Sequence, residues 1–131
     1  MSFDIEGMRV FLSGPMTGKP EHNRKAFMEA ETWCELHGAW GVYNPARNIP
    51  KADEPDGTHE QYMLVTLNEL TRYANRAHTC ADARPFYDAL ILLDGWWASK
   101  GANAERMVAQ ACGIEVIELK DAMDWAKEDE W

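Results

Sequence analysis

The stretch ALILL at residues 89–93 is an unbroken run of apolar side chains, and it decides the fold. A strand with one face in water alternates apolar and polar residues, whereas an unbroken run indicates a strand covered on both faces in a parallel sheet. The run stops at Asp94-Gly95. Apolar residues at helical spacing then lead to Gly113, and a strand over 114–119 follows. The second half of the chain therefore predicts strand, helix and strand.

The first half of the chain alternates in the same way. It predicts a strand over 8–12, a loop over 13–18, a helix from an N-cap at Asn23 to a C′ residue at Gly38, a strand over 41–43 and a loop over 47–57. Thr58 and Gln61 match a capping box. The helix that they begin is expected to have an apolar face of Met63, Leu67, Leu70, Ala74 and Ala77. Residues 120–131 are expected to form a short helix or a frayed tail.

This alternation predicts an α/β fold, a Rossmann-like (flavodoxin-like) parallel sheet of four to five strands with helices on both faces. A chain of 131 residues is the size of one domain, which we place at 1–131. Ligands of such sheets bind beyond the carboxyl ends of the strands. We therefore expect the glycine-containing loops that follow the strands at 8–12 and 89–93 to face one cleft.

Composition and charge exclude several classes of protein. No stretch approaches the roughly 20 apolar residues of a membrane span, and the first residues, MSFDIE, are acidic where a signal peptide is basic. We expect a cytoplasmic protein with no membrane partner. A net charge of −9 disfavours a nucleic-acid polymer as partner. Three widely separated cysteines predict free, mostly buried thiols, and four histidines without a metal-binding spacing predict chemistry without a metal or cofactor.

The segment SKGANAE at 99–105 places reactive groups at the start of a helix. Ser99, Gly101 and Ala102 are expected to present a hydroxyl and free backbone N–H groups, which bind anions and phosphate above all. Glu105 lies about one turn further on, where the helix dipole favours the ionised carboxylate that a nucleophile requires. The alternative is that Glu105 only stabilises its own helix.

The loop SGPMTG at 13–18 is the second candidate binding element. Ser13, Gly14, Met16 and Gly18 are expected to bring backbone N–H groups close to a sugar or phosphate, because glycine permits close approach. Glycines also occur in plain strand-to-helix turns, and that alternative stays open.

Several motifs occur together in a characteristic order. They are FLSGPMTG at 11–18, Asn23 with Phe27, NPA at 44–46, YM at 62–63, LLDGW at 92–96 and SKGA at 99–102 with Glu105. In this set the chain resembles the small phage and bacterial branch of the nucleoside 2-deoxyribosyltransferase-like superfamily, which is related to nucleotide N-glycosidases. The resemblance covers nearly all of residues 8–119.

The resemblance implies a reaction and a substrate. A carboxylate at the position of Glu105 attacks C1′ of the sugar, and water or another base resolves the glycosyl-enzyme. A serine six residues earlier, here Ser99, binds the 5′-phosphate in nucleotide-hydrolysing relatives, which favours a nucleoside 5′-monophosphate over a nucleoside. Relatives generally form dimers or larger assemblies that share site residues, so a homodimer or higher homo-oligomer is expected.

Three residues depart from the pattern of the superfamily: Phe11 replaces a tyrosine, Thr66 an aspartate and Leu64 an arginine. Phe11 and Thr66 bear on the choice between two functions. The first is an enzyme acting on N-glycosidic bonds, and the second is a catalytically silent protein that binds or sequesters a nucleotide. A structural or assembly protein is the third. Asp94, at the end of the central strand, is expected to supply the missing carboxyl group, and the alternative is an aspartate that caps the turn at Gly95.

The segment from Thr71 to Tyr87 is longer than the usual link between this helix and the central strand, and it contains Arg72, Arg76 and Arg84. It is either a lid that delivers arginines to phosphate or a solvated helix extension followed by a loop.

Overall fold

The structure is a computed structural model that describes residues 4–48, 58–75 and 79–129. Within these ranges one sheet contains the strands β1 (Arg9–Ser13), β2 (Gly41–Tyr43), β3 (Ala89–Leu92) and β4 (Glu115–Glu118). The helices are α1 (Arg24–Leu36), α2 (His59–Leu70), α3 (Lys100–Ala111) and α4 (Leu119–Asp129). Short 3-10 turns form η1 (Pro20–Asn23), η2 (Pro45–Asn48), η3 (Cys80–Asp82) and η4 (Trp96–Ala98).

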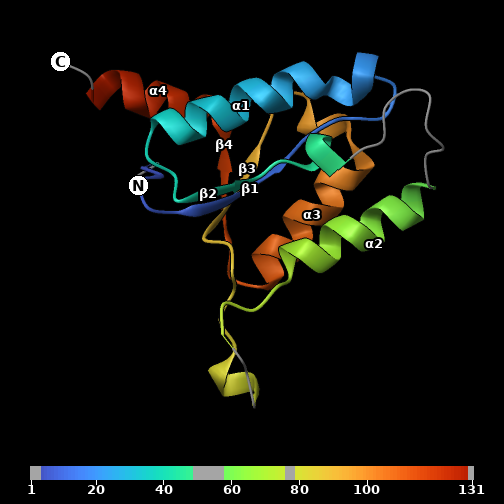
Figure 1. Cartoon of the computed structure of the whole chain (residues 1–131), viewed down its shortest axis with the longest axis vertical. Helices are drawn as coiled ribbons and strands as arrows, with labels where there is room; N and C mark the ends of the chain where they lie inside the picture. Colours follow the sequence, from blue (N-terminus) through green and yellow to red (C-terminus); the bar gives the residue numbers. More distant parts are fainter. Residues whose placement is uncertain (1–3, 49–57, 76–78, 130–131) are drawn as a thin grey trace.

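The sheet is parallel throughout, with strand order β2-β1-β3-β4. β3 lies between β1 and β4, and all of its side chains are buried. Figure 1 shows α1 and α4 on one face of the sheet and α2 and α3 on the other. The predicted α/β fold is confirmed, with four strands in the described part of the chain.

The two faces of the sheet carry separate cores, and β1 contributes to both. Val10 and Leu12 pack in the core that includes Phe27 of α1, whereas Phe11 packs in the core that includes Ala109 of α3. Successive side chains of a strand point to opposite faces. Ser13 therefore shares the face of Phe11 and points toward α3.

The helix boundaries follow the predicted caps with one exception. Thr58 and Gln61 form the complete capping box of α2, and Gly38 after α1 has a φ of +86°. Asn23 occupies the N-cap position of α1, but its side chain does not cap the helix. Its Nδ2 donates to the Pro15 carbonyl at 2.9 Å instead, so Asn23 holds the 13–18 loop against the start of α1.

The helix at 58–70 is shorter than its apolar pattern predicts. α2 ends at Leu70, and the chain then pairs with itself through an antiparallel bridge between Tyr73 and Pro85 and a bond of 2.9 Å from the Phe86 amide to the Arg72 carbonyl. Residues 71–75 and 79–87 form an arm that extends away from the sheet (Figure 1). Ala74 lies in this arm rather than in the helix, and Ala77 is outside the described residues.

The arm is not a lid over the carboxyl ends of the strands. At its base, Asp88 accepts a bond of 2.8 Å from the Arg9 amide, at the amino end of β1. The Arg9 and Arg72 guanidinium groups lie 4.5 and 4.1 Å from the Phe86 ring centroid. Arg72 is therefore held at the edge opposite the expected cleft, and it also forms an ion pair with Glu69. Arg76 and the expected loop over 49–57 lie outside the described residues.

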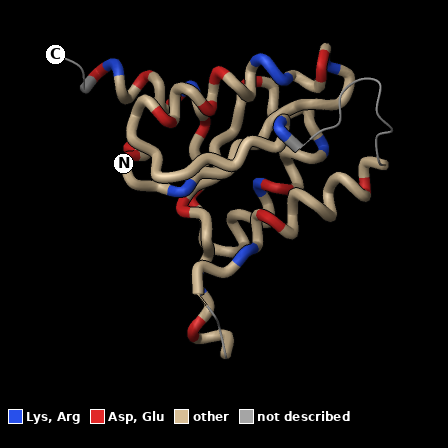
Figure 2. Tube along the Cα trace, in the orientation of Figure 1, with Lys and Arg blue, Asp and Glu red and all other residues tan. Residues whose placement is uncertain are grey.

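Charged residues of both signs are distributed over the molecule. Figure 2 shows Lys and Arg scattered along the described trace rather than gathered on one element, and Asp and Glu on the helices as well as in the arm. Among the residues that the structure describes, no helix is long and apolar enough to cross a membrane.

Candidate active site

The centre of the site is a buried hydrogen bond between two residues that are 92 positions apart. Ser13, the last residue of β1, donates from Oγ to Oε1 of Glu105 in the second turn of α3 at 2.6 Å. Ser13 is fully buried and Glu105 is 4% exposed. The structure thus joins two predicted site residues at the carboxyl edge of the sheet, but through the Ser13 side chain rather than its backbone.

Burial controls the charge of Glu105. It raises the pKa of this carboxyl above the ordinary value of 4.5, and hydrogen bonds from the Ser13 and Thr66 hydroxyls oppose the rise. Burial opposes the effect expected of the helix dipole, because loss of hydration disfavours the ionised carboxylate. A raised pKa favours the protonated form of this carboxyl.

Thr66 and Phe11, two of the three departures from the superfamily pattern, have different surroundings. Thr66 is buried on α2, its hydroxyl donates to the Met63 carbonyl at 3.5 Å, and it lies near enough to Glu105 to lower the pKa of that carboxyl. Phe11 stacks on Tyr43 at 4.8 Å between ring centroids and meets Tyr87 edge-on. Thr66 is thus part of the site, whereas Phe11 belongs to an aromatic core cluster.

The start of α3 differs in detail from the predicted anion site. Ser99 is the N-cap, and its Oγ accepts a bond of 3.1 Å from the Ala102 amide. Ala102 is therefore not a free donor, and its methyl group is buried. The amides of Lys100 and Gly101 have no carbonyl partner in the first turn, as is usual at a helix start. A Cβ on Gly101 would lie 3.3 Å from Met63 Sδ and 3.8 Å from His59 Cε1, so the starts of α2 and α3 meet here.

The loop over 13–18 lies against the turn that follows β3. The Leu93 amide donates to the Ser13 carbonyl at 2.8 Å, and a Cβ on Gly95 would lie 3.4 Å from Pro15 Cγ. The two glycine-containing loops are thus adjacent, as expected. The close approach that Gly14 permits is to Leu93 of the same chain, and Gly18 occupies a turn at a φ of +79° with open space around it.

Tyr62, one turn before Thr66 on α2, is a site residue whose role the sequence analysis did not assign. Its hydroxyl donates to the Sδ atom of Met16 at 2.7 Å, which joins the 13–18 loop to α2. The pKa of Tyr62 is raised, first by burial and then by the charge of Glu105. The spacing of four residues between Tyr62 and Thr66 was the available signal, because it places both on one helix face.

Asp94 lies at the same edge of the sheet, two positions after Leu92, the residue paired with Ser13. Its side chain is exposed and makes no hydrogen bond to any described residue, which gives no support to the turn-capping alternative. Asp88, in contrast, accepts the hydrogen bond from the Arg9 amide at the opposite edge and has a structural role.

Asp94→Asn is therefore expected to leave the thermal stability of the protein unchanged. Under the reaction that the resemblance implies, it is expected to slow base release at least about tenfold, because an amide cannot supply a proton to the leaving base. Thermal melting and a base-release assay measure the two effects. A loss of about 1 kcal/mol in stability with ordinary turnover would assign Asp94 to the turn instead.

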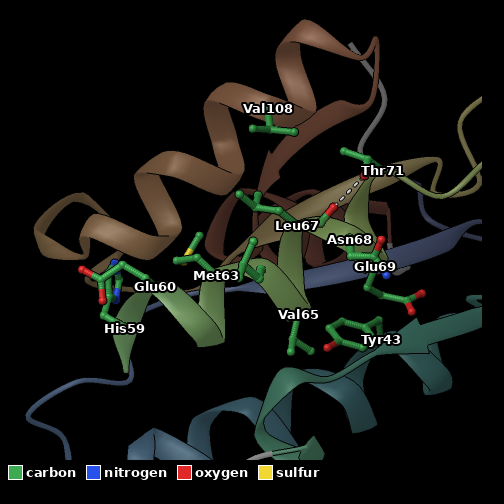
Figure 3. Close-up of a pocket in the computed structure, with 11 residues that line it drawn as sticks. Tyr43, His59, Glu60, Met63, Val65, Leu67, Asn68, Glu69, Thr71 and Val108 are labelled. Atoms are coloured by element: carbon green, nitrogen blue, oxygen red, sulfur yellow. Dashed lines mark hydrogen bonds between the residues drawn. The ribbon is translucent and has the colours of Figure 1, made fainter. Parts of the chain in front are cut away.

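An open groove of about 1040 Å³ runs along α2, on the outer side of the site (Figure 3). Met63 and Leu67 of α2, Val108 of α3 and Tyr43 of β2 line it, but Ser13, Tyr62 and Glu105 do not. The groove therefore follows the exposed face of α2, where Leu64 is 71% exposed. We place the candidate reactive group at the buried Glu105 carboxyl and not in this groove.

Comparison with known proteins gives a family and no activity. Residues 8–118 match a family described as a domain of unknown function (DUF4406). This range begins just before β1 and ends with β4, so it includes every candidate site residue. No curated protein and no solved structure matches the chain.

Proposed function

The chain belongs to the DUF4406 family of unknown function, and from the geometry of its site we propose that it cleaves or transfers at the N-glycosidic bond of a nucleoside 5′-monophosphate or nucleoside. The observation that carries the proposal is the buried Ser13–Glu105 hydrogen bond at the carboxyl edge of the sheet, beside the start of α3. Ligands of parallel α/β sheets bind at this edge, and perturbed carboxyl groups in such positions are typical of active sites.

In the proposed reaction a Glu105 carboxylate oxygen forms a bond to C1′ while the bond from C1′ to the base nitrogen breaks. The base leaves with the electron pair of that bond and takes up a proton, for which Asp94 is the expected donor; the water or second base that attacks next gives up a proton and restores it. Water or a second base then attacks C1′ and releases the carboxylate, with retained configuration. The Ser13 hydroxyl fixes one carboxyl oxygen, which leaves the other for attack. The resemblance to the nucleoside 2-deoxyribosyltransferase-like superfamily supports this assignment.

The first experiment is incubation of the protein with a panel of nucleosides and their 5′-monophosphates, followed by chromatography for free base. A second base is added in parallel to separate transfer from hydrolysis. Release of base above that of a heat-inactivated sample supports the enzyme, and mass spectrometry of the intact protein reveals a glycosyl adduct.

A catalytically silent nucleotide-binding or sequestering protein is the second candidate function. The observation that favours it is the near-complete burial of Glu105, together with Thr66 in place of a second carboxyl group. Tight nucleotide binding without base release from any member of the panel would select this candidate.

The position of Ser99 at the start of α3 predicts that ligands with a phosphate group bind more tightly than ligands without one. The Lys100 and Gly101 amides and the Ser99 hydroxyl proton are available to a phosphate, and bonds to a charged acceptor are strong. We expect 5′-monophosphates to bind at least roughly tenfold more tightly than their nucleosides in calorimetry. Ser99→Asp preserves the helix cap but repels phosphate, so it is expected to remove this preference while keeping nucleoside binding.

The matched control for this prediction is Ser99→Thr, which keeps both the hydroxyl and the cap and is expected to keep the preference. Equal affinities of wild-type protein for nucleotide and nucleoside would refute the phosphate site.

The remaining expectations on partners stay predictions. For the expected homodimer or larger homo-oligomer, the surface to test is formed by Leu64 and Val65 of α2 and Met107 of α3, which are exposed apolar side chains on neighbouring helices. Scattered basic residues and a net charge of −9 support a small-molecule ligand over a nucleic-acid polymer. The cytoplasmic location is likewise untested.

A further inference from the structure

The reaction proposed above needs a hydrogen-bond donor to the sugar or the leaving base, and Phe11 and Thr66 stand here in place of a tyrosine and an aspartate. Phe11 has no hydroxyl group, and its ring is enclosed in the aromatic cluster with Tyr43 and Tyr87. Thr66 has no acidic group. A replacement donor should come from the same part of the molecule and should not be committed to a strong protein acceptor.

Tyr62 meets the requirement of position. It precedes Thr66 by one turn of α2, and Thr66 interacts with Glu105 through its hydroxyl. Residues four apart lie on one helix face, so Tyr62 and Thr66 both face the buried carboxyl. The Tyr62 hydroxyl also touches Met16, a residue of the loop that begins at Ser13. Tyr62 therefore lies between the loop after β1 and the carboxyl on α3.

The Tyr62 hydroxyl is also able to exchange its present hydrogen-bond acceptor for one on a ligand. Within the described residues, the partner of its hydroxyl is the Met16 thioether at 2.7 Å, and a thioether sulfur is a weak acceptor. A half-buried hydroxyl with a weak partner gains free energy when a better acceptor arrives. Burial and the nearby carboxyl raise its pKa, so the phenol stays protonated and acts as a donor over the physiological range.

We propose that Tyr62 donates a hydrogen bond to the ligand, in addition to the donors at the start of α3, and that its hydroxyl leaves the Met16 sulfur for an oxygen or nitrogen acceptor of the bound nucleotide. No bond other than this hydrogen bond is exchanged. The inference rests on the location of the site proposed above, but it does not depend on whether the protein turns the nucleotide over.

The test is calorimetric binding of a nucleoside 5′-monophosphate and of ribose 5-phosphate to wild-type protein and Tyr62→Phe. Loss of one hydrogen bond to the ligand is expected to weaken nucleotide binding by roughly threefold to tenfold. If the acceptor is on the sugar, both ligands weaken equally. If it is on the base, only the nucleotide weakens. The matched control is Tyr73→Phe in the arm, 63% exposed, which is expected to bind both ligands as wild type does.

A second variant separates this role from a purely structural one. Met16→Leu keeps the side-chain volume but removes the sulfur that competes for the Tyr62 hydroxyl, so it is expected to tighten nucleotide binding. In the Met16→Leu/Tyr62→Phe double variant, that gain is expected to vanish, because the two effects are coupled. Thermal melting verifies that each variant is folded.

Wild-type affinity in Tyr62→Phe would overturn the proposal, as would a Met16→Leu gain that persists in the double variant. The failure of the proposed function has a different signature. In that case wild-type protein releases no base from any nucleotide, while the binding measurements still report on Tyr62.

Discussion

Glu105→Gln is expected to abolish release of free base, with a loss of roughly a thousandfold or more in kcat, while nucleotide binding and the fold are retained. Glutamine has the same shape and still accepts the Ser13 hydrogen bond, but its amide cannot form the glycosyl ester. The measurement is chromatography of free base under single-turnover conditions, with calorimetry for binding.

The control is Glu29→Gln, an exposed glutamate of α1 on the opposite face of the sheet, which should turn over as wild type does. Glu105→Gln should also show no glycosyl adduct by mass spectrometry. Unchanged turnover in Glu105→Gln would remove this residue from the mechanism and leave it as a buried helix residue.

The same variant reports on the pKa of Glu105 through stability. A carboxyl whose pKa is raised by folding keeps its proton longer in the folded chain, so wild-type stability falls as pH rises from about 4.5 through the folded pKa. Glutamine does not ionise. Glu105→Gln is therefore expected to be more stable than wild type at pH 7–8, with a difference that shrinks toward pH 4. Denaturant titrations at several pH values measure this, and base release by wild type should rise over the same range.

The fold was predictable because short stretches of the sequence indicate whether a strand is buried on both faces and where a helix begins or ends. The unbroken run over 89–93 required cover on both faces, and β3 has it. The capping box at Thr58 and the glycine at Gly38 fixed helix ends through local hydrogen bonds and backbone geometry. Residues 120–129 form most of α4, the short terminal helix that was one of two expectations.

The site was predictable only in part, because its central interaction joins distant residues. Ser13 and Glu105 were each expected to face the cleft. No sequence pattern, however, indicates that the Ser13 hydroxyl donates a hydrogen bond to the Glu105 carboxyl. The charge of Glu105 depends on burial, and spacing along a helix does not reveal burial. The sequence places Tyr62 in a motif but gives it no role, because its contact with Met16 depends on how α2 packs against the 13–18 loop.

Other predictions failed where tertiary contacts overrode local pattern. The apolar spacing to Ala77 predicted a longer helix, but pairing between Tyr73 and Pro85 ends it early. Thiols were expected to be mostly buried, yet only Cys34 is, while Cys80 lies in the arm and Cys112 at the end of α3.

Gly14→Ala is expected to have the largest effect on stability of any single methyl group added in the site. A Cβ at residue 14 would lie 2.8 Å from the Cβ of Leu93, and a Cβ cannot rotate away as the end of a long side chain can. The loop after β1 and the turn after β3 must therefore separate. We expect a loss of about 1–3 kcal/mol in the free energy of unfolding, measured by urea titration.

The matched control for this prediction is Gly41→Ala in β2, where a Cβ would have nothing within 4 Å. Both substitutions restrict the unfolded chain equally, so the difference between them isolates the contact with Leu93. Because Ser13 precedes Gly14 and donates to Glu105, Gly14→Ala is also expected to displace the carboxyl and lower base release, whereas Gly41→Ala should not. Equal stability of the two variants would show that the loops separate without cost, and the close approach at Gly14 would then have no part in holding the site together.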